Sequence, residues 1–130
     1  MADVTVKRTE DFETTYGGAM VKVRAGLGVT SFGMQVLRLP AGLTAYPAHD
    51  HSDDGQEEVY SVLEGQATLS VGGEDHDLTP GAFARVGPNE SRKLATGELP
   101  AAILVLGGVP GQAYEIVPVT EEGAPDPFDG

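Results

Sequence analysis

The 130-residue sequence contains no cysteine and no tryptophan, and it has only three histidines. Without cysteine the chain can form no disulfide, offers no thiol nucleophile and has no thiolate metal ligand. Any metal site must therefore use nitrogen and oxygen donors. Such donors favour Fe, Mn, Ni, Co, Cu or Zn held by imidazole and carboxylate over an iron–sulfur cluster.

Basic residues are also scarce, with 8 Lys and Arg against 20 Asp and Glu, which gives a formal net charge of −12. Phosphate binding requires a basic surface, so the composition predicts no nucleic-acid partner. The same negative charge disfavours binding to anionic membranes.

Long hydrophobic runs are missing as well. Residues 1–18 contain no apolar core of the kind found in signal peptides. The run Ala101 to Leu106 is far too short to span a membrane. We therefore expect a cytoplasmic location.

Turn-forming residues are abundant, with 18 Gly and 9 Pro between short runs rich in Val, Leu, Ile, Thr, Phe and Tyr. No window shows the apolar spacing of a helix of ten or more residues. The pattern predicts an all-β sandwich or barrel. Glu64-Gly65 and Gly72-Gly73 are expected to form tight hairpins. The predicted strands are residues 19–24, 28–38, 43–49, 57–63, 66–72, 74–79, 82–87, 91–95, 101–107 and 112–117.

The length predicts one domain, which we place at residues 1–117. Within it, residues 1–15 are expected to be either an edge strand or a loose segment. Residues 118–130 contain three Pro, four acids and no base, so we expect a loosely ordered acidic tail.

The most informative motif is His49-Asp50-His51. On a strand, residues i and i+2 point to the same face, so both imidazoles can converge on one metal ion. A carboxylate from the next strand would complete a site of two histidines and one carboxylate. Strand parity places Gln56 and Glu58 on one face and Glu57 on the other. The residues alone leave all three open as the third ligand.

The same segment resembles the first motif of the cupin superfamily, a glycine, then H-x-H, then a glutamate followed by six residues and a glycine. Here the motif is carried by Gly42, His49, His51, Glu58 and Gly65. The gap between His51 and Glu58 is longer than is usual in the family, and the loop at residues 52–55 is expected to absorb the insertion.

A second cupin motif is degraded. Pro80-Gly81 and Pro88 keep its frame, but Ser91 or Arg92 stands where the family has a histidine. The resemblance covers residues 28–117, and it implies a small single-domain cupin with an antiparallel jelly-roll barrel.

The resemblance selects Glu58 as the third ligand beside His49 and His51, with a divalent transition metal as cofactor. Gln56, Tyr60 and Arg92 are the candidate substrate-binding residues. Arg92 has two further interpretations, an ion pair with Glu58 that replaces the metal, or a solvent-facing position beside Glu90 or Glu98. His76, between two aspartates, is expected on the surface.

Three functions follow from these features. The first is a metal-dependent enzyme acting on a small organic molecule as an oxygenase, isomerase or decarboxylase. The alternative is a non-enzymatic ligand-binding cupin with weak or no metal and Arg92 as anion anchor. A third is metal-free acid–base catalysis by His49 or His51, for which the sequence shows no dedicated aspartate partner. Small cupins are often homodimers, and residues 28–38 and 101–107 are the expected interface.

Overall fold

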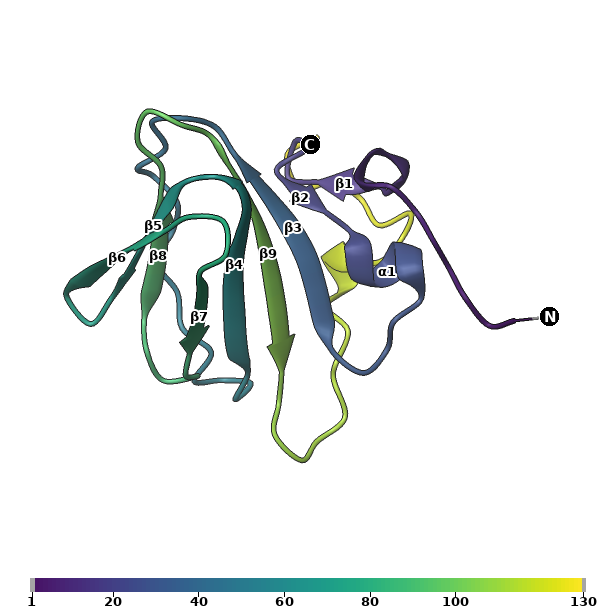
Figure 1. Ribbon diagram of the computed structural model, residues 1–130. Helices are drawn as coiled ribbons and strands as arrows, with labels where there is room; N and C mark the ends of the chain where they lie inside the picture. Colours follow the sequence, from purple (N-terminus) through teal and green to yellow (C-terminus); the bar gives the residue numbers. More distant parts are fainter. Residues whose placement is uncertain (1, 130) are drawn as a thin grey trace.

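The computed structural model describes residues 2–129, which form two antiparallel sheets (Figure 1). The larger sheet has the strand order β1-β2-β3-β9-β4-β7, and the smaller has the order β6-β5-β8. The larger sheet consists of β1 (Thr14–Thr15), β2 (Met20–Val21), β3 (Gly33–Leu39), β9 (Ala101–Gly108), β4 (Glu57–Gly65) and β7 (Phe83–Val86). The smaller consists of β6 (Glu74–Leu78), β5 (Ala67–Val71) and β8 (Arg92–Ala95). The prediction of an antiparallel jelly-roll is confirmed.

The main core lies between the two sheets. The larger sheet contributes Tyr60, Val62 and Ile103, and the smaller contributes Leu69 and Leu94, all at most 2% exposed. Because side chains alternate between the faces of a strand, β3, β4, β5 and β9 each give alternate residues to this core.

A second, smaller cluster lies on the outer face of the larger sheet. Helix α1 (Val23–Leu27) places Val23 against Val36 of β3, and Phe12 and Leu104 pack against them. A Cβ at Gly26 of the helix would clash with the ring of Phe12. This glycine therefore allows the helix to approach the N-terminal segment closely.

Six predicted strands, 57–63, 66–72, 74–79, 82–87, 91–95 and 101–107, match β4 to β9 to within two residues at either end. The first two differ more. In the range 19–24 only Met20 and Val21 are in a strand, because the chain turns into α1 at Val23. In the range 28–38 the strand starts at Gly33, after Gly28 ends the helix with a left-handed φ of 81°.

The predicted strand at 43–49 is wrong. The segment pairs with β8 and the residue after it only at its two ends, Leu43 with Thr96 and His49 with Arg92. The segment 43–49 contains two more residues than the stretch 92–96 that it faces, and Pro47 has no N–H to donate. The predicted strand at 112–117 is also wrong, since the chain there is irregular.

One predicted hairpin forms and the other does not. Gly72 and Gly73, with φ values of 60° and 81°, join β5 to β6 in a two-residue turn. Glu64-Gly65 instead ends β4, after which the chain crosses from the larger sheet to the smaller one. Gly65 also has a positive φ of 80°, so this glycine allows the chain to turn from one sheet to the other.

The C-terminal segment lies beside the N-terminal hairpin of β1 and β2 (Figure 1). The backbone N–H groups of Tyr16 and Gly17 donate to the Asp126 carboxylate at 3.0 and 2.8 Å. The buried Lys22 ammonium donates to the carbonyl of Glu121 at 2.7 Å, next to the 3-10 turn η2 (Pro118–Thr120). The composition predicted a loosely ordered tail at residues 118–130. Within residues 118–129 these contacts instead join the segment to the N-terminal part of the chain, and Gly130 lies outside the described residues.

Residues 2–8 are exposed and extend away from the sheets, ahead of the 3-10 turn η1 (Thr9–Asp11) (Figure 1). Within residues 2–129 no helix has the length and apolar character needed to cross a membrane.

We expect Gly65→Ala to destabilise the fold by about 3 kcal/mol or more, since an added Cβ would clash with the Pro100 carbonyl and the positive φ adds strain. Gly73→Ala is the matched control. Gly73 has nearly the same φ but no atom within 4 Å of an added Cβ, so its substitution should cost only about 1 kcal/mol. Urea unfolding at 25 °C measures both, and equal losses would contradict the steric role of Gly65.

Candidate functional site

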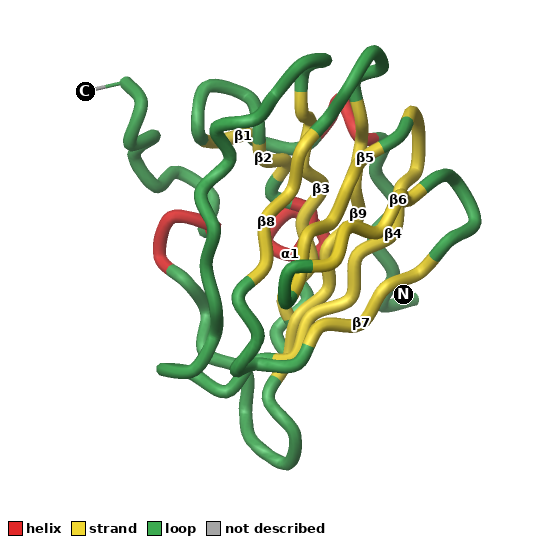
Figure 2. The backbone as a smooth tube through the Cα atoms, turned by 90° about the vertical axis from the view of Figure 1, so that its left-hand side faces the viewer, coloured by secondary structure: helices red, strands yellow, loops and turns green. Residues whose placement is uncertain are grey.

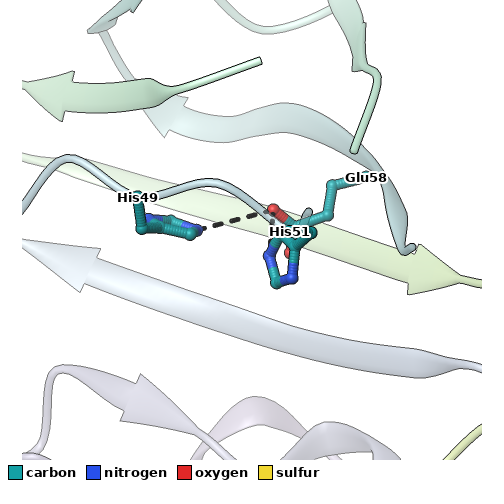
Figure 3. Close-up of side chains that lie close together, drawn as sticks. All are labelled: His49, His51 and Glu58. Atoms are coloured by element: carbon teal, nitrogen blue, oxygen red, sulfur yellow. Dashed lines mark ion pairs between the residues drawn. The ribbon is translucent and has the colours of Figure 1, made fainter. Parts of the chain in front are cut away.

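The two histidines are held beside β8 by backbone hydrogen bonds. His49 exchanges bonds of 3.0 and 2.8 Å with Arg92, and the N–H of His51 donates to Pro88 at 2.8 Å. Their rings lie edge to face with centroids 5.2 Å apart. Both point toward Glu58 of β4, and one ligand atom from each of the three residues lies within 4.8 Å of the others (Figure 3).

His51 is oriented by Asp54. Its Nδ1 lies 3.1 Å from Asp54 Oδ1, and Gln56 donates its backbone and side-chain N–H groups to the same carboxylate at 3.0 and 2.9 Å. Burial raises the pKa of Asp54, but the backbone N–H of Gln56 and the contact with His51 outweigh it, so the pKa is lowered. A carboxylate on one ring nitrogen is the usual arrangement for a histidine whose other nitrogen binds metal.

The other ring nitrogen, Nε2 of His51, is buried and makes no hydrogen bond of normal geometry, although a carboxylate oxygen lies close to it. It lies 3.1 Å from Glu58 Oε1, and Nε2 of His49 lies 3.7 Å from the same oxygen. Buried polar atoms are almost always satisfied, so this nitrogen requires an explanation. Two imidazoles and a carboxylate with an unpartnered nitrogen between them fit a divalent transition metal.

Glu58 is the centre of the polar network. Its Oε1 accepts hydrogen bonds of 2.7 Å from the hydroxyl of Tyr60 and from Nη1 of Arg92. Burial raises the pKa of Glu58, but contacts with His49, Tyr60, His51 and Arg92 outweigh it and lower the pKa to about 2. The carboxylate is therefore ionised at neutral pH. Burial and the Glu58 charge raise the pKa of Tyr60, which keeps the phenol protonated as a donor.

Arg92 is 1% exposed, so the solvent-facing interpretation is wrong. Besides Glu58, its guanidinium donates to the carbonyls of Glu90 and Gly87 at 3.0 and 2.5 Å. The predicted ion pair with Glu58 is present at 2.7 Å. All three donor nitrogens of Arg92 are thus directed at acceptors within the protein.

The alternatives to Glu58 lie elsewhere. Glu57 is on the face of β4 opposite to Glu58, in agreement with strand parity, and pairs with Arg85 of β7 at 2.7 Å. Gln56 is buried next to Glu58, but its amide donates to Asp54. His76 has half of its side chain exposed, in agreement with a surface position.

A cavity of about 180 Å³ opens next to the site. His51, Gln56 and Glu58 line it on one side. The lining also includes Tyr114 and Val117 of the irregular segment after β9. In Figure 2 this segment and the C-terminal residues cross one side of the barrel as a long stretch of loop.

Two site residues were missed from the sequence. Asp54 lies in the loop that the sequence predicts to absorb an insertion. A carboxylate three residues after His51 could have indicated a turn that brings the two side chains together. The sequence showed no aspartate partner for His49 or His51, but in the structure Asp54 is the partner of His51. Tyr114 was placed in a strand, and no local signal links it to the cavity.

Comparisons with known proteins agree with this architecture. A family model described as a cupin domain matches residues 35–107, more than half of the chain. No curated protein matches the sequence.

The similarity to solved structures extends over a larger part of the chain than the match to the family model. A cupin protein from Bacteroides fragilis has a TM-score of 0.67 at 20% identity, covering 90% of this chain and 93% of its own. A sugar phosphate isomerase of the cupin superfamily from Silicibacter pomeroyi has a TM-score of 0.63 at 21% identity, covering 80% and 75%. A structure reported with DMSP lyases has a TM-score of 0.56 at 29% identity, covering 65% of this chain and 42% of that one.

We expect the stability of the metal-free protein to fall by about 2 kcal/mol between pH 5 and pH 3 because of Glu58. Its pKa is lower in the folded state, so the unfolded chain takes up the proton first. Its stabilising effect is complete above about pH 4.5 and is lost as the pH falls toward 2. Urea unfolding in the presence of a chelator should show a shallower pH dependence for Glu58→Gln. The outward-facing Glu57→Gln is the control, and equal slopes in all three proteins would contradict the assignment.

Proposed function

Because the chain belongs to the cupin family, we propose that it is a metal-dependent cupin that binds and acts on a small organic molecule. His49, His51 and Glu58 would hold a divalent transition metal, one of Fe, Mn, Ni, Co, Cu or Zn. The observation that carries this proposal is the buried, unpartnered Nε2 of His51, which lies close to an ionised carboxylate and a second imidazole.

A metal bound there would act as a Lewis acid toward a substrate oxygen or would activate dioxygen. The protein's own residues have distinct tasks. Asp54 fixes the ring of His51, while Tyr60 and Arg92 hold the carboxylate of Glu58. Gln56, at the cavity wall, is placed to contact the substrate. A small substrate is consistent with the size of the cavity and with structural relatives named as a sugar phosphate isomerase and DMSP lyases.

A second candidate is a ligand-binding cupin without metal. The buried ion pair of Arg92 and Glu58 favours it, because the guanidinium already neutralises the carboxylate that a metal would use. Arg92 is one of the two residues, with Ser91, that stand where the family has a histidine, and its positive charge repels a nearby cation. In this case the network would be a rigid polar wall of the cavity.

Elemental analysis by plasma mass spectrometry separates the two candidates. Tag-free protein purified without added metal should contain close to one equivalent of a transition metal. The His51→Ala variant should lose well over half of it, because the ligand set drops to two. His76→Ala removes a histidine with a half-exposed side chain on β6 and should keep the parent's metal content.

A parent that binds no metal after reloading would reject the metal-dependent function in favour of the ligand-binding cupin. Metal that persists unchanged in His51→Ala would show that the ion is held elsewhere.

We also propose that the protein forms a homodimer through the outer face of β9, β4 and β7. Helix α1 covers the neighbouring part of this face around Val36 and Leu104, which were expected at the interface. The part of this face that α1 leaves uncovered includes Phe83, which is 75% exposed. It also includes Phe32, which is 39% exposed and lines one surface hollow with Val59 and Leu106. Burying such apolar side chains against a second copy would remove them from water.

Light scattering after size exclusion should give the parent a mass of twice 13.5 kDa. Phe83→Asp should shift the protein to the monomer mass, because a carboxylate cannot be buried there without a partner. Val6→Asp, in the exposed N-terminal segment, is the control and should remain dimeric. A monomeric parent would contradict this interface.

A further inference from the structure

Gln35 is a buried polar residue on the core face of the larger sheet. On β3 it pairs with Val105, which in turn pairs with Tyr60, so the three side chains share one row of the interior. The next row consists of Gly33, Gly107 and Glu58. Gln35 therefore lies diagonally across the sheet from Glu58, about 12 Å away at two strand spacings across and two residues along, and lines the same cavity.

The amide of Gln35 is incompletely satisfied. The residue is 9% exposed, and its Oε1 is buried without a hydrogen-bond partner. Burying a polar atom without a partner lowers stability, and such atoms are rare in folded proteins. A leucine or methionine would fill this core position without that cost. An amide in this place is explained by a ligand group that completes its hydrogen bonding.

Two glycines leave room between Gln35 and the candidate metal ligands. A Cβ at Gly107 would lie 2.6 Å from Oε1 of Gln56, and one at Gly33 would lie 2.8 Å from the hydroxyl of Tyr114. Any larger residue at these positions would push the two polar side chains out of place. The glycines thus let Gln56 and Tyr114 reach over the sheet at the cavity.

The lining defines the chemistry of a ligand. Its polar part includes three residues with side-chain oxygen acceptors, Gln35, Gln56 and Glu58. Of these oxygens, Oε1 of Gln35 is buried without a hydrogen-bond partner. The remaining wall is largely apolar, with Met20, Val105 and Val119. A cavity of about 180 Å³ is slightly larger than the engineered cavities of about 150 Å³ that hold benzene.

We infer that Gln35 is a specificity-determining residue, whose amide oxygen accepts a hydrogen bond from a hydroxyl or amine of a small ligand with an apolar body. The inference rests on the proposed function in one respect, that this cavity receives a small organic molecule. It does not depend on whether a metal is bound.

The first test is the thermal stability of Gln35→Met, which keeps the side-chain length and removes the unsatisfied amide. We expect the ligand-free variant to melt about 3 °C above the parent. Gln66→Met, in the turn between β4 and β5 and outside the cavity, is the control and should melt with the parent. A lower melting temperature for Gln35→Met would show that the amide supports the fold, and would overturn the inference.

The second test uses benzyl alcohol and anisole, two isomers of which only the alcohol has a hydrogen-bond donor. Their dissociation constants can be measured by ligand-observed NMR. We expect the parent to bind benzyl alcohol about tenfold more tightly than anisole, and Gln35→Met to bind the two equally. An unchanged preference in Gln35→Met, or a parent that binds neither compound or does not discriminate, would overturn the inference.

Metal content measured on the same samples separates this inference from the proposed function. Loss of discrimination in Gln35→Met at the parent's metal content supports Gln35 as a ligand contact. Discrimination in a parent that holds no metal rejects the metal site and leaves the role of Gln35 intact. Bound metal without discrimination overturns the role of Gln35 alone.

Discussion

The buried carboxylate of Glu58 is the constraint on which the site depends. A carboxylate removed from water must be compensated by charge or hydrogen bonds. Arg92 and Tyr60 provide this compensation at 2.7 Å each. The guanidinium is in turn fixed by two carbonyls of the turn before β8, and the backbone of the same residue pairs with His49. The position of the histidines therefore follows from the same network that stabilises the carboxylate, and the site cannot be separated from the packing of β4 against β8.

Arg92 also changes what the site can do. In the usual cupin pattern a histidine at this place would add a neutral ligand, whereas here a permanent positive charge lies against the carboxylate. Binding of a cation at His49, His51 and Glu58 must overcome that repulsion. The ionised carboxylate of Glu58 works in the opposite direction, because its negative charge attracts a cation. Metal affinity is the balance of these two effects, which makes metal content the decisive property of this protein.

The cavity next to the site is assembled from distant parts of the chain. Its lining combines residues of β3, β4 and β9 with residues of the β1–β2 hairpin and of the segment after β9, which form the second part of its wall. Contacts between the two ends of the chain, such as the Asp126 carboxylate with Tyr16 and Gly17, hold the second part in place. The residues that define the chemistry of the cavity are thus supported by segments that show no functional motif of their own.

The sequence by itself determined the all-β class, six of the strands and the metal-ligand candidates. Turn residues at short intervals, side-chain alternation and the spacing of His49, His51 and Glu58 are local features of the chain, and strand parity separated Glu57 from Glu58. Only the tertiary structure decided the partner of Arg92, which is 34 residues from Glu58, and the burial of Nε2 of His51 without a partner beside the cavity. It also decided that residues 43–49 pair only at their ends and that Gln35 lines the cavity with an unsatisfied amide. These features depend on which strands become neighbours and on what each buried atom then contacts, and no local pattern encodes such contacts.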